Sequence, residues 1–247
     1  MQCSPCLEKA HYEANLIGVL GSYPERMNED DMRLRKKKNL GARMMKHAHL
    51  LISEPETLRG RWLEEYQYER LHIELGCGRG RFTVETAKTE PDTLLAALEK
   101  SADAMIIAVE RAAAEDLCNL RFANALADNL PAYFAPGEVS RIYINFCDPW
   151  PSNGHAKRRL TSGHFLGMYR QALCPDGEIR FKTDNLALFE FSLRAFEKHG
   201  FALADISRDL HSGGPNGILT DYEQKFHDQG MPICYACARR LNMAVRQ

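Results

Sequence analysis

The sequence has no apolar run long enough to cross a bilayer, so we expect no membrane-spanning segment and no membrane partner. It also lacks the opening pattern of an export signal, a charged stretch followed by an apolar one, which favours a cytoplasmic protein. A strong net charge is missing as well. The formal charge is −1 at pH 7, which excludes a wholly basic nucleic-acid coat but allows local basic patches.

Cysteine is present in a number that could suggest a zinc site. Eight cysteines include two C-x-x-C pairs, Cys3/Cys6 and Cys234/Cys237. The second pair lies in the strand-like stretch "MPICYACARRL", where residues three apart point to opposite faces. We therefore expect no metal site and reduced, mostly buried thiols.

Acidic residues are missing from the window 32–53, and this makes it a basic patch. The cations of the window are Arg33, Arg35, Lys36, Lys37, Lys38, Arg43 and Lys46. A second patch combines Lys157, Arg158 and Arg159. A charge run taken alone usually marks a solvated face, and contact with nucleic-acid phosphates is the alternative for both patches.

The 247 residues are enough for one substantial core, and the pattern predicts three regions. Residues 1–31 show no sustained period and are expected to form a poorly ordered extension. Residues 32–69 are expected to form a basic arm followed by a docking helix, with Leu58, Trp62 and Tyr66 on one stripe. Residues 70–247 are expected to form the main domain.

From Leu71 onward, short apolar strands alternate with helical patterns, which is typical of an α/β fold with a mostly parallel sheet. We expect seven strands with helices on both faces. Thr161 is the expected N-cap of the helix after the fourth strand, and residues 175–177 the expected turn before the fifth. The helix after Asn185 should bury Leu186, Phe189, Leu193 and Phe196 and end at Gly200.

The first strand ends in "ELGCGRG", which supplies Glu74 and the glycines Gly76, Gly78 and Gly80. Ligands of open α/β sheets bind at the carboxyl ends of strands, and glycine lets the backbone approach them closely. The spacing differs from the dinucleotide fingerprint and resembles the first motif of S-adenosylmethionine-dependent methyltransferases. A plain strand-to-helix turn would also explain the glycines.

Two further strand ends extend this candidate cofactor site. Glu99 ends the second strand, where a carboxylate can accept both ribose hydroxyls, and an exposed acid at a helix N-terminus is the alternative explanation. The third strand ends at Asn124-Ala125-Leu126, where either the Asn124 side chain or the Leu126 amide could contact adenine.

The fourth strand ends in "DPWPSNGHAKRRL". Prolines on both sides of Trp150 restrict the backbone, so that Asp148 and an aromatic ring are held close to the same edge. An indole can stack on a base and a carboxylate can accept from a guanine edge, whereas a buried Trp capping the sheet is the structural alternative.

The order "ELGCGRG", "FCDPWPSNGHAKRRL", "FKTDN", "TDYEQKF" resembles the bacterial tRNA (guanine-N7-)-methyltransferase family from about Met32 to the end. The resemblance implies a Rossmann-like class I methyltransferase fold and methyl transfer from S-adenosylmethionine to N7 of guanine at position 46 in the tRNA variable loop. Met32 would then be a possible natural start.

On matching positions, the resemblance implies the following roles. Asp148 would be the acid of the catalytic loop. The cofactor would be bound by Glu74, Gly76, Gly78, Gly80, Glu99, Asn124, Leu126 and Asp148. The substrate would be bound by Ser152, Asp184, Thr220, Asp221, Tyr222 and Glu223, and RNA would be contacted by Gly154, His155, Lys157, Arg158 and Arg159. The partner would be tRNA, and the enzyme a monomer or homodimer without a metal.

Two departures from the family pattern matter. The family loop usually reads P-K-x-R-H, whereas this chain has Ser152, Asn153 and Gly154 between Pro151 and His155 and so has two fewer cations. Leu126 stands where an acid or amide is common. Another adenosylmethionine-dependent enzyme acting on an exocyclic amine, or a non-catalytic RNA-binding protein on the same fold, are the alternatives.

Overall fold

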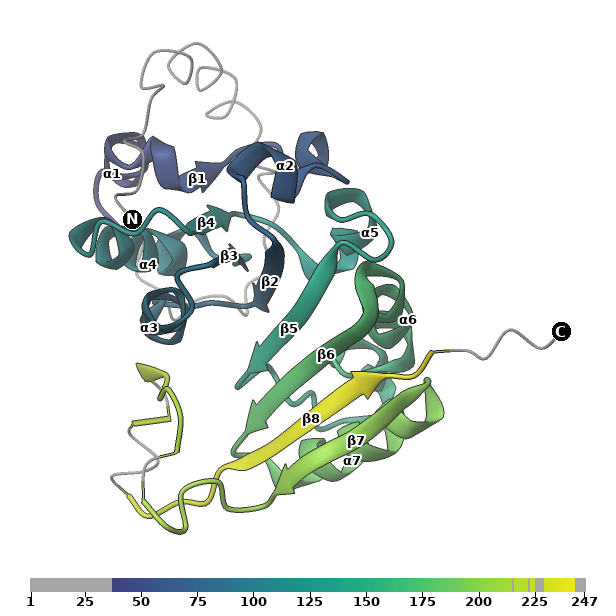
Figure 1. The fold of residues 1–247 in the computed structure, drawn as a ribbon. Coiled ribbons are helices and arrows are strands. Elements are labelled where there is room, and N and C mark those ends of the chain that lie inside the picture. The colour runs from purple at the N-terminus through teal and green to yellow at the C-terminus, as the bar shows by residue number, and fades with distance from the viewer. Residues whose placement is uncertain (1–36, 215, 222, 225–228, 243–247) are drawn as a thin grey trace, which may run out of the picture.

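A computed structural model describes residues 37–214, 216–221, 223–224 and 229–242 (Figure 1). The predicted extension over 1–31, three cations of the basic arm, Tyr222 and the Cys3/Cys6 pair lie outside the described residues. Among the residues described, no helix is both long and apolar enough to span a membrane.

The core of the structure is one sheet with the strand order β1-β4-β3-β2-β5-β6-β8-β7. All pairings are parallel except those of β8 with β6 and β7. The predicted α/β class with a mostly parallel sheet is therefore confirmed, with one strand more than the seven expected. The strands are β1 (Leu51–Ile52), β2 (Arg70–Leu75), β3 (Thr93–Leu98), β4 (Leu120–Ala123), β5 (Val139–Asn145), β6 (Leu173–Thr183), β7 (Phe201–Ser207) and β8 (Cys234–Arg240).

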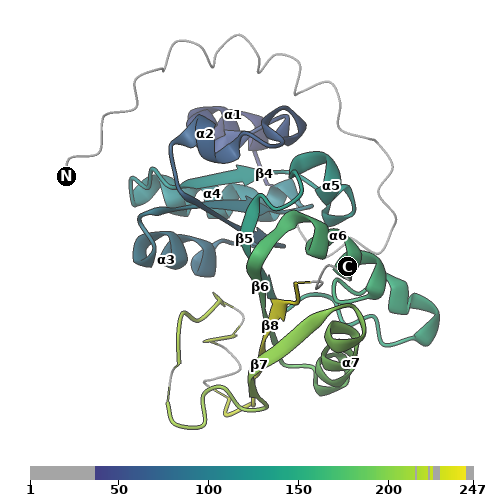
Figure 2. The same ribbon diagram turned by 45° about the vertical axis from the view of Figure 1, so that its right-hand side comes forward.

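Helices cover both faces of the sheet, as predicted. In Figure 2, α3 and α4 lie to the left of the strands and α5, α6 and α7 to the right. The helices are α1 (Leu40–Lys46), α2 (Trp62–Tyr66), α3 (Arg81–Thr89), α4 (Ala102–Ala114), α5 (Leu130–Tyr133), α6 (Gly163–Ala172) and α7 (Leu186–Lys198); the 3-10 turns are η3 (Ala48–Leu50), η4 (Pro55–Leu58), η5 (Ala127–Asn129) and η6 (Asn153–Arg158).

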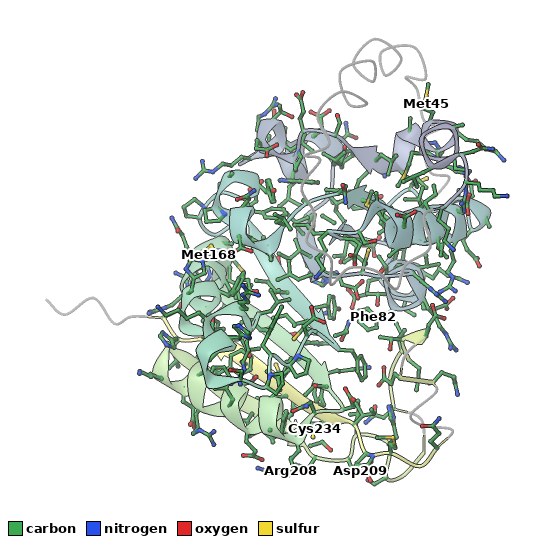
Figure 3. The ribbon with its side chains drawn as sticks, turned by 180° about the vertical axis from the view of Figure 1, so that it is seen from behind. Met45, Phe82, Met168, Arg208, Asp209 and Cys234 are labelled. Atoms are coloured by element: carbon green, nitrogen blue, oxygen red, sulfur yellow. The ribbon has the colours of Figure 1, made fainter. Side chains whose placement is uncertain are left out.

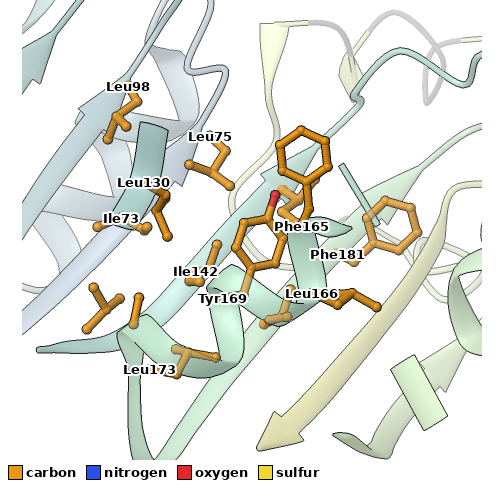
Figure 4. Close-up of a cluster of buried hydrophobic side chains, with 14 of the residues drawn as sticks. Ile73, Leu75, Leu98, Leu130, Ile142, Phe165, Leu166, Tyr169, Leu173 and Phe181 are labelled. Atoms are coloured by element: carbon orange, nitrogen blue, oxygen red, sulfur yellow. The ribbon is translucent and has the colours of Figure 1, made fainter. Parts of the chain in front are cut away.

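The sheet separates two apolar layers. Every residue of β3 is buried, as expected for a central parallel strand covered on both sides. On one side, α6 packs Phe165, Leu166 and Tyr169 toward Ile142 of β5 (Figure 4). On the other side, α3, α4 and Met44 of α1 pack on the alternate side chains of the strands.

The docking segment 54–69 differs from the continuous helix that we predicted. Gly60 has a φ of 79°, and it separates η4 from α2. The expected stripe is nevertheless directed inward: Leu58 and Trp62 are buried and Tyr66 is partly buried. The Trp62 indole donates from Nε1 to the Tyr133 carbonyl at 2.9 Å and stacks on Phe134.

Three local predictions were wrong for reasons of packing. Ser162, not Thr161, is the N-cap of α6, and the buried Thr161 hydroxyl instead lies 2.7 Å from Ser192 Oγ. Leu186 is 54% exposed, and Leu188 of the same turn is buried in its place. Residues 175–177 form a bulged insertion inside β6 and not a turn before it. The predicted cap at Asn185 and the helix end at Gly200 are confirmed.

Candidate active site

The glycine loop follows β2 at the edge where all the parallel strands end. Gly76, Gly78 and Gly80 have φ values of 81°, 56° and 76°, a region that L-residues rarely adopt. A Cβ on Gly76 or Gly78 would meet open space, whereas one on Gly80 would lie 2.4 Å from the Ala108 Cβ. Gly80 is thus required for close packing of the loop on α4, and the other two leave the backbone open toward the cavity.

Glu99 joins the glycine loop to the start of α4. Its Oε2 accepts from Gly78 N and its Oε1 from Ser101 N, both at 2.9 Å. Ser101 caps α4 by accepting from Ala104 N. The nearly buried carboxylate is thereby held against the loop by backbone amides, at the position where we predicted a ribose-binding acid.

Glu74 is the other predicted cofactor acid, and it is buried beneath the loop. Its Oε2 accepts from Thr83 Oγ1 at 2.5 Å and its Oε1 from Asn145 Nδ2 at 3.1 Å. Burial raises the pKa of Glu74 to about 7, against the lowering effect of these two hydrogen bonds. Sequence reasoning missed Asn145, whose signal is a single amide at the end of the apolar strand β5.

A cavity of about 400 Å³ opens above Glu74, a size in the range of small-molecule sites. The side chain of Phe82, labelled in Figure 3, belongs to its wall. The other lining residues are Glu74, Gly76, Cys77, Gly78, Arg79, Gly80, Arg81, Asn145, Phe146, Thr220 and Asp221. Residues from the glycine loop, from β5 and from the distant loop before β8 are therefore brought to one cavity.

Asp148 follows Phe146 of the cavity wall by two residues and is not among the described residues that line the cavity. Its side chain is 66% exposed, and Oδ2 lies 3.6 Å from Lys100 Nζ. Lys100 directly follows Glu99, so the ion pair connects the ends of β3 and β5. Sequence reasoning missed Lys100, although a cation next to a predicted cofactor acid was a usable signal.

The backbone around Asp148 is strained on both sides. Phe146 has a φ of 52° and Trp150 a φ of 42°, left-handed conformations that cost on the order of 1–3 kcal/mol each in a non-glycine residue. The Trp150 ring is covered by the Arg158 guanidinium, 4.9 Å from its centre, and contacts the His155 ring edge-on. Trp150 is thus part of a packed loop.

The basic loop after Trp150 exposes most of the predicted RNA-contact residues. Ser152 precedes η6, and Ser152, Gly154, His155, Lys157 and Arg158 are exposed. Arg159 differs from this expectation because it is only 8% exposed and donates to backbone carbonyls of its own loop.

At the end of β4, Asn124 is exposed and donates from Nδ2 to the Glu99 carbonyl at 2.8 Å. Its amide therefore ties β4 to β3, which gives it a structural role beside the predicted adenine contact. Leu126 is 51% exposed on the same edge. Asp184 follows β6 at this edge as well and is half-buried.

The "TDYE" segment forms a capping box, in which the side chains and amides of two residues pair reciprocally. Glu223 N donates to Thr220 Oγ1 at 2.8 Å, and Thr220 N donates to Glu223 Oε2 at 3.1 Å. Asp221 makes a two-point ion pair with Arg111 of α4, at 3.0 and 3.4 Å. Thr220 and Asp221 are thereby fixed at the cavity, and Figure 1 shows the described part of the segment over 209–224 turning back toward α3.

Glu223, for which the resemblance implied a substrate contact, is fully buried. Its Oε1 accepts from Lys182 Nζ at 3.0 Å and lies 2.8 Å from His211 Nε2, and its Oε2 is 3.1 Å from Lys182 Nζ. Lys182 also donates to the Ile218 carbonyl at 2.8 Å. With both oxygens engaged by protein donors, Glu223 holds the 209–224 segment on β6.

Within the described part of the chain, no group of three or more His, Cys, Asp or Glu side chains could hold a metal ion. Cys234 and Cys237 are buried free thiols, and burial raises the pKa of Cys237 to about 11.

Comparison with known proteins identifies the family. A family model described as a putative methyltransferase matches residues 68–236. A tRNA (guanine-N(7)-)-methyltransferase of Geobacillus kaustophilus is 43% identical over 208 residues, 83% of this chain and 95% of the relative. The enzyme of that name from Bacillus cytotoxicus is 43% identical over 204 residues, 82% of this chain and 94% of the relative. The chain belongs to the tRNA (guanine-N7-)-methyltransferase family.

Solved structures agree on the fold of this family member. The antibiotic-resistance methyltransferase Kmr is 20% identical with a TM-score of 0.54 and covers 74% of this chain and 92% of its own. The 16S rRNA methyltransferase KamB is 18% identical with a TM-score of 0.56, and the match covers 73% of this chain and 93% of KamB. The predicted class I methyltransferase fold and the predicted family are confirmed.

For this methyltransferase, the structure brings together most of the predicted cofactor residues and separates the predicted substrate residues into two groups. Glu74, the glycine loop and Glu99 form one continuous unit, with Asp148 beside it. Thr220 and Asp221 line the same cavity from the opposite side, whereas Glu223 lies beneath them in the protein interior.

Proposed function

We propose that this methyltransferase transfers the methyl group of S-adenosylmethionine to N7 of guanine 46 in the variable loop of tRNA. The enzyme class and the methyl donor follow from the family. The observation that carries the assignment to this chain is the cavity between the glycine loop and Asp221, which Glu74 lines, together with Glu99, which accepts a hydrogen bond from Gly78 of the loop.

The residues around the cavity suit an adenosyl cofactor. The glycine backbone is open toward the cavity, and Glu99 is held where a carboxylate can accept ribose hydroxyls. We assign cofactor binding to Glu74, Gly76, Gly78, Gly80 and Glu99, with Asn124 and Leu126 at the adenine end. The bound cofactor would supply an electrophilic methyl group on a positively charged sulfur.

The main contribution of the protein to methyl transfer would be to position the two reactants. Guanine N7 has an exposed lone pair and carries no proton, so it would form the new bond to the methyl carbon as the carbon–sulfur bond breaks, with S-adenosylhomocysteine as the neutral leaving group, and no general base is needed. Holding two reactants in line can contribute several kcal/mol of rate enhancement. Asp148, as the catalytic-loop acid, would hold the guanine edge next to the methyl group, with Asp184 and the Thr220 to Asp221 turn as further contacts.

Binding of tRNA is assigned to the exposed cations of the loop after Trp150 and to Lys46 of α1. Lys157 and Arg158 are exposed on η6, with His155 beside them, and neighbouring cations attract phosphates. Ser152 and Gly154 lie in this loop and would contact RNA without adding charge. We further propose a cytoplasmic enzyme, a monomer or homodimer, that needs no metal ion.

One experiment tests the function directly. Purified protein is incubated with isotope-labelled S-adenosylmethionine and with tRNA that lacks the modification, and the labelled base is mapped. Label at N7 of guanine 46 supports the proposal. Label on an exocyclic amine, or on another RNA only, would refute it. Binding of the cofactor without any transfer would favour the non-catalytic alternative.

A further inference from the structure

Arg159 lies in the RNA-contact segment of the loop, but its side chain is directed into the protein. It is 8% exposed, while its neighbours Lys157 and Arg158 are exposed. Its Nε lies 3.1 Å from the Pro149 carbonyl and 3.3 Å from the Trp150 carbonyl, and its Nη2 donates to the Trp150 carbonyl at 2.9 Å. These carbonyls immediately follow Asp148.

The guanidinium is also packed from the other side. Its Cζ lies 4.4 Å from the centre of the Phe191 ring on α7. The planar guanidinium can donate in two directions while one of its faces stacks on an aromatic ring. Lysine cannot supply this geometry. The backbone of Arg159 is fixed too, because Ser162 N donates to its carbonyl at 2.8 Å.

The backbone that receives these bonds needs a restraint. Trp150 is held at a φ of 42°, and Phe146, on the other side of Asp148, at 52°. A non-glycine residue stays in this region only where the surrounding structure fixes it. Arg159 provides that restraint directly at the Pro149 and Trp150 carbonyls.

We propose that Arg159 is a positioning residue of the methyl-transfer reaction, which fixes the Pro149-Trp150 backbone and through it the direction of the Asp148 carboxylate, and that it does not contact RNA phosphates. The proposal rests on the proposed function. In this proposal Lys157 and Arg158 are exposed cations that face the substrate, and Arg159 is a buried cation that holds the catalytic loop.

The test compares Arg159→Lys, which keeps the charge, with Lys157→Ala and with Arg194→Lys, an exposed arginine on α7 as a matched control. We expect Arg159→Lys to lower kcat at saturating tRNA at least tenfold while the slope of log affinity against log salt stays that of the wild type. Lys157→Ala should reduce the slope by about 0.7–0.9, the value of one phosphate contact. Arg194→Lys should change neither quantity.

The opposite pattern would overturn the proposal. If an Arg159→Ala variant reduces the salt slope as Lys157→Ala does, and Arg159→Lys retains the wild-type kcat, then Arg159 is an RNA contact. Phe191→Leu is the second variant, should Arg159→Lys fail to fold. It removes the ring beneath the guanidinium without changing charge, and we expect a lower kcat with an unchanged slope. Wild-type kcat in this variant, with Arg159→Lys unfolded, would refute the positioning role.

A spectroscopic measurement separates this proposal from the proposed function. The chain has two tryptophans, so a Trp62→Phe background leaves Trp150 as the only indole. Adding Arg159→Lys should shift the Trp150 emission and increase its quenching by acrylamide, whether or not tRNA is the substrate. An unchanged Trp150 signal would overturn the positioning role, whereas wild-type protein that fails to methylate tRNA would refute only the function.

Discussion

Lys182 and Glu223 form a buried ion pair that joins the last parallel strand of the sheet to the 209–224 segment. The Lys182 Nζ lies 3.0 Å from Glu223 Oε1, and the side chains are 8% and 0% exposed. Burial lowers the pKa of Lys182, while the Glu223 carboxylate acts in the opposite direction. The pair fixes the segment whose Thr220 and Asp221 line the cavity, so its integrity should determine the shape of the site.

Lys182→Met should therefore leave a buried carboxylate without its ammonium partner, while His211 Nε2 and the Thr220 amide remain in contact with it. Removing one member of a buried pair costs about 3–5 kcal/mol, and we expect the free energy of unfolding in urea to fall by that amount, with methylation reduced as the segment loses its anchor. Lys88→Met, which breaks the exposed pair with Glu115, is the matched control. A loss for Lys182→Met as small as that of an exposed pair, about 0–1 kcal/mol, would contradict this role.

Asp148→Ala should reduce methylation far more than cofactor binding. The expected loss in kcat/KM is on the order of 10²-fold, the scale of a misplaced reactant, while calorimetry should show a nearly unchanged dissociation constant for S-adenosylmethionine. Asp176→Ala, an exposed acid in the β6 insertion, serves as the control. Equal losses of methylation and cofactor binding would assign Asp148 to the cofactor alone.

Asp184→Ala tests the predicted substrate contact at the end of β6. Loss of a hydrogen bond to a charged group, worth about 1.5–3 kcal/mol, should lower kcat/KM for tRNA by roughly 10- to 100-fold. Asp184→Asn keeps one acceptor oxygen, so its kcat/KM for tRNA should lie between those of the wild type and Asp184→Ala. Cofactor affinity should stay close to the wild-type value in both variants, and calorimetry that finds it abolished would refute the substrate role.

Glu74 should make stability depend on pH in a defined window. Its pKa rises from 4.5 to about 7 on folding, so the folded state binds the proton more tightly than the unfolded state. Stability from this group is thus present at low pH and decreases as pH rises from 4.5 through 7, by about 3 kcal/mol at most.

Glu74→Gln removes this titration while keeping the size of the side chain. The free energy of unfolding of Glu74→Gln minus that of the wild type should therefore increase between pH 4.5 and 7 and be constant above it. Urea unfolding at several pH values measures this difference. A difference that is flat across the window would show that Glu74 titrates alike in both states.

The parts of the site that sequence could predict are those encoded locally. Glycines after an apolar strand, and Glu99 at the next strand end, each carry their meaning in a few neighbouring residues, and the structure joins them through the Gly78 amide. The capping box of Thr220 and Glu223 is also a local pattern, because its two residues lie three positions apart.

What sequence could not predict depends on contacts between distant segments. Arg158 and Arg159 are equivalent as letters, and only the place of Phe191 on α7 decides which one is buried. The burial of Glu223 requires Lys182, 41 positions earlier, to meet it. Thr161 and Ser162 are similarly good caps, and the contact with Ser192 selects between them.

The left-handed residues on either side of Asp148, Phe146 and Trp150, lower the stability of the protein while they fix the loop needed for activity. A glycine at position 146 or 150 would relieve the local conformational cost, and it would also free the backbone that aims the acid. Selection for a more heat-resistant protein would therefore favour exchanges in this loop that selection for turnover rejects. Variants isolated for thermal tolerance alone should accumulate changes here and lose methylation first.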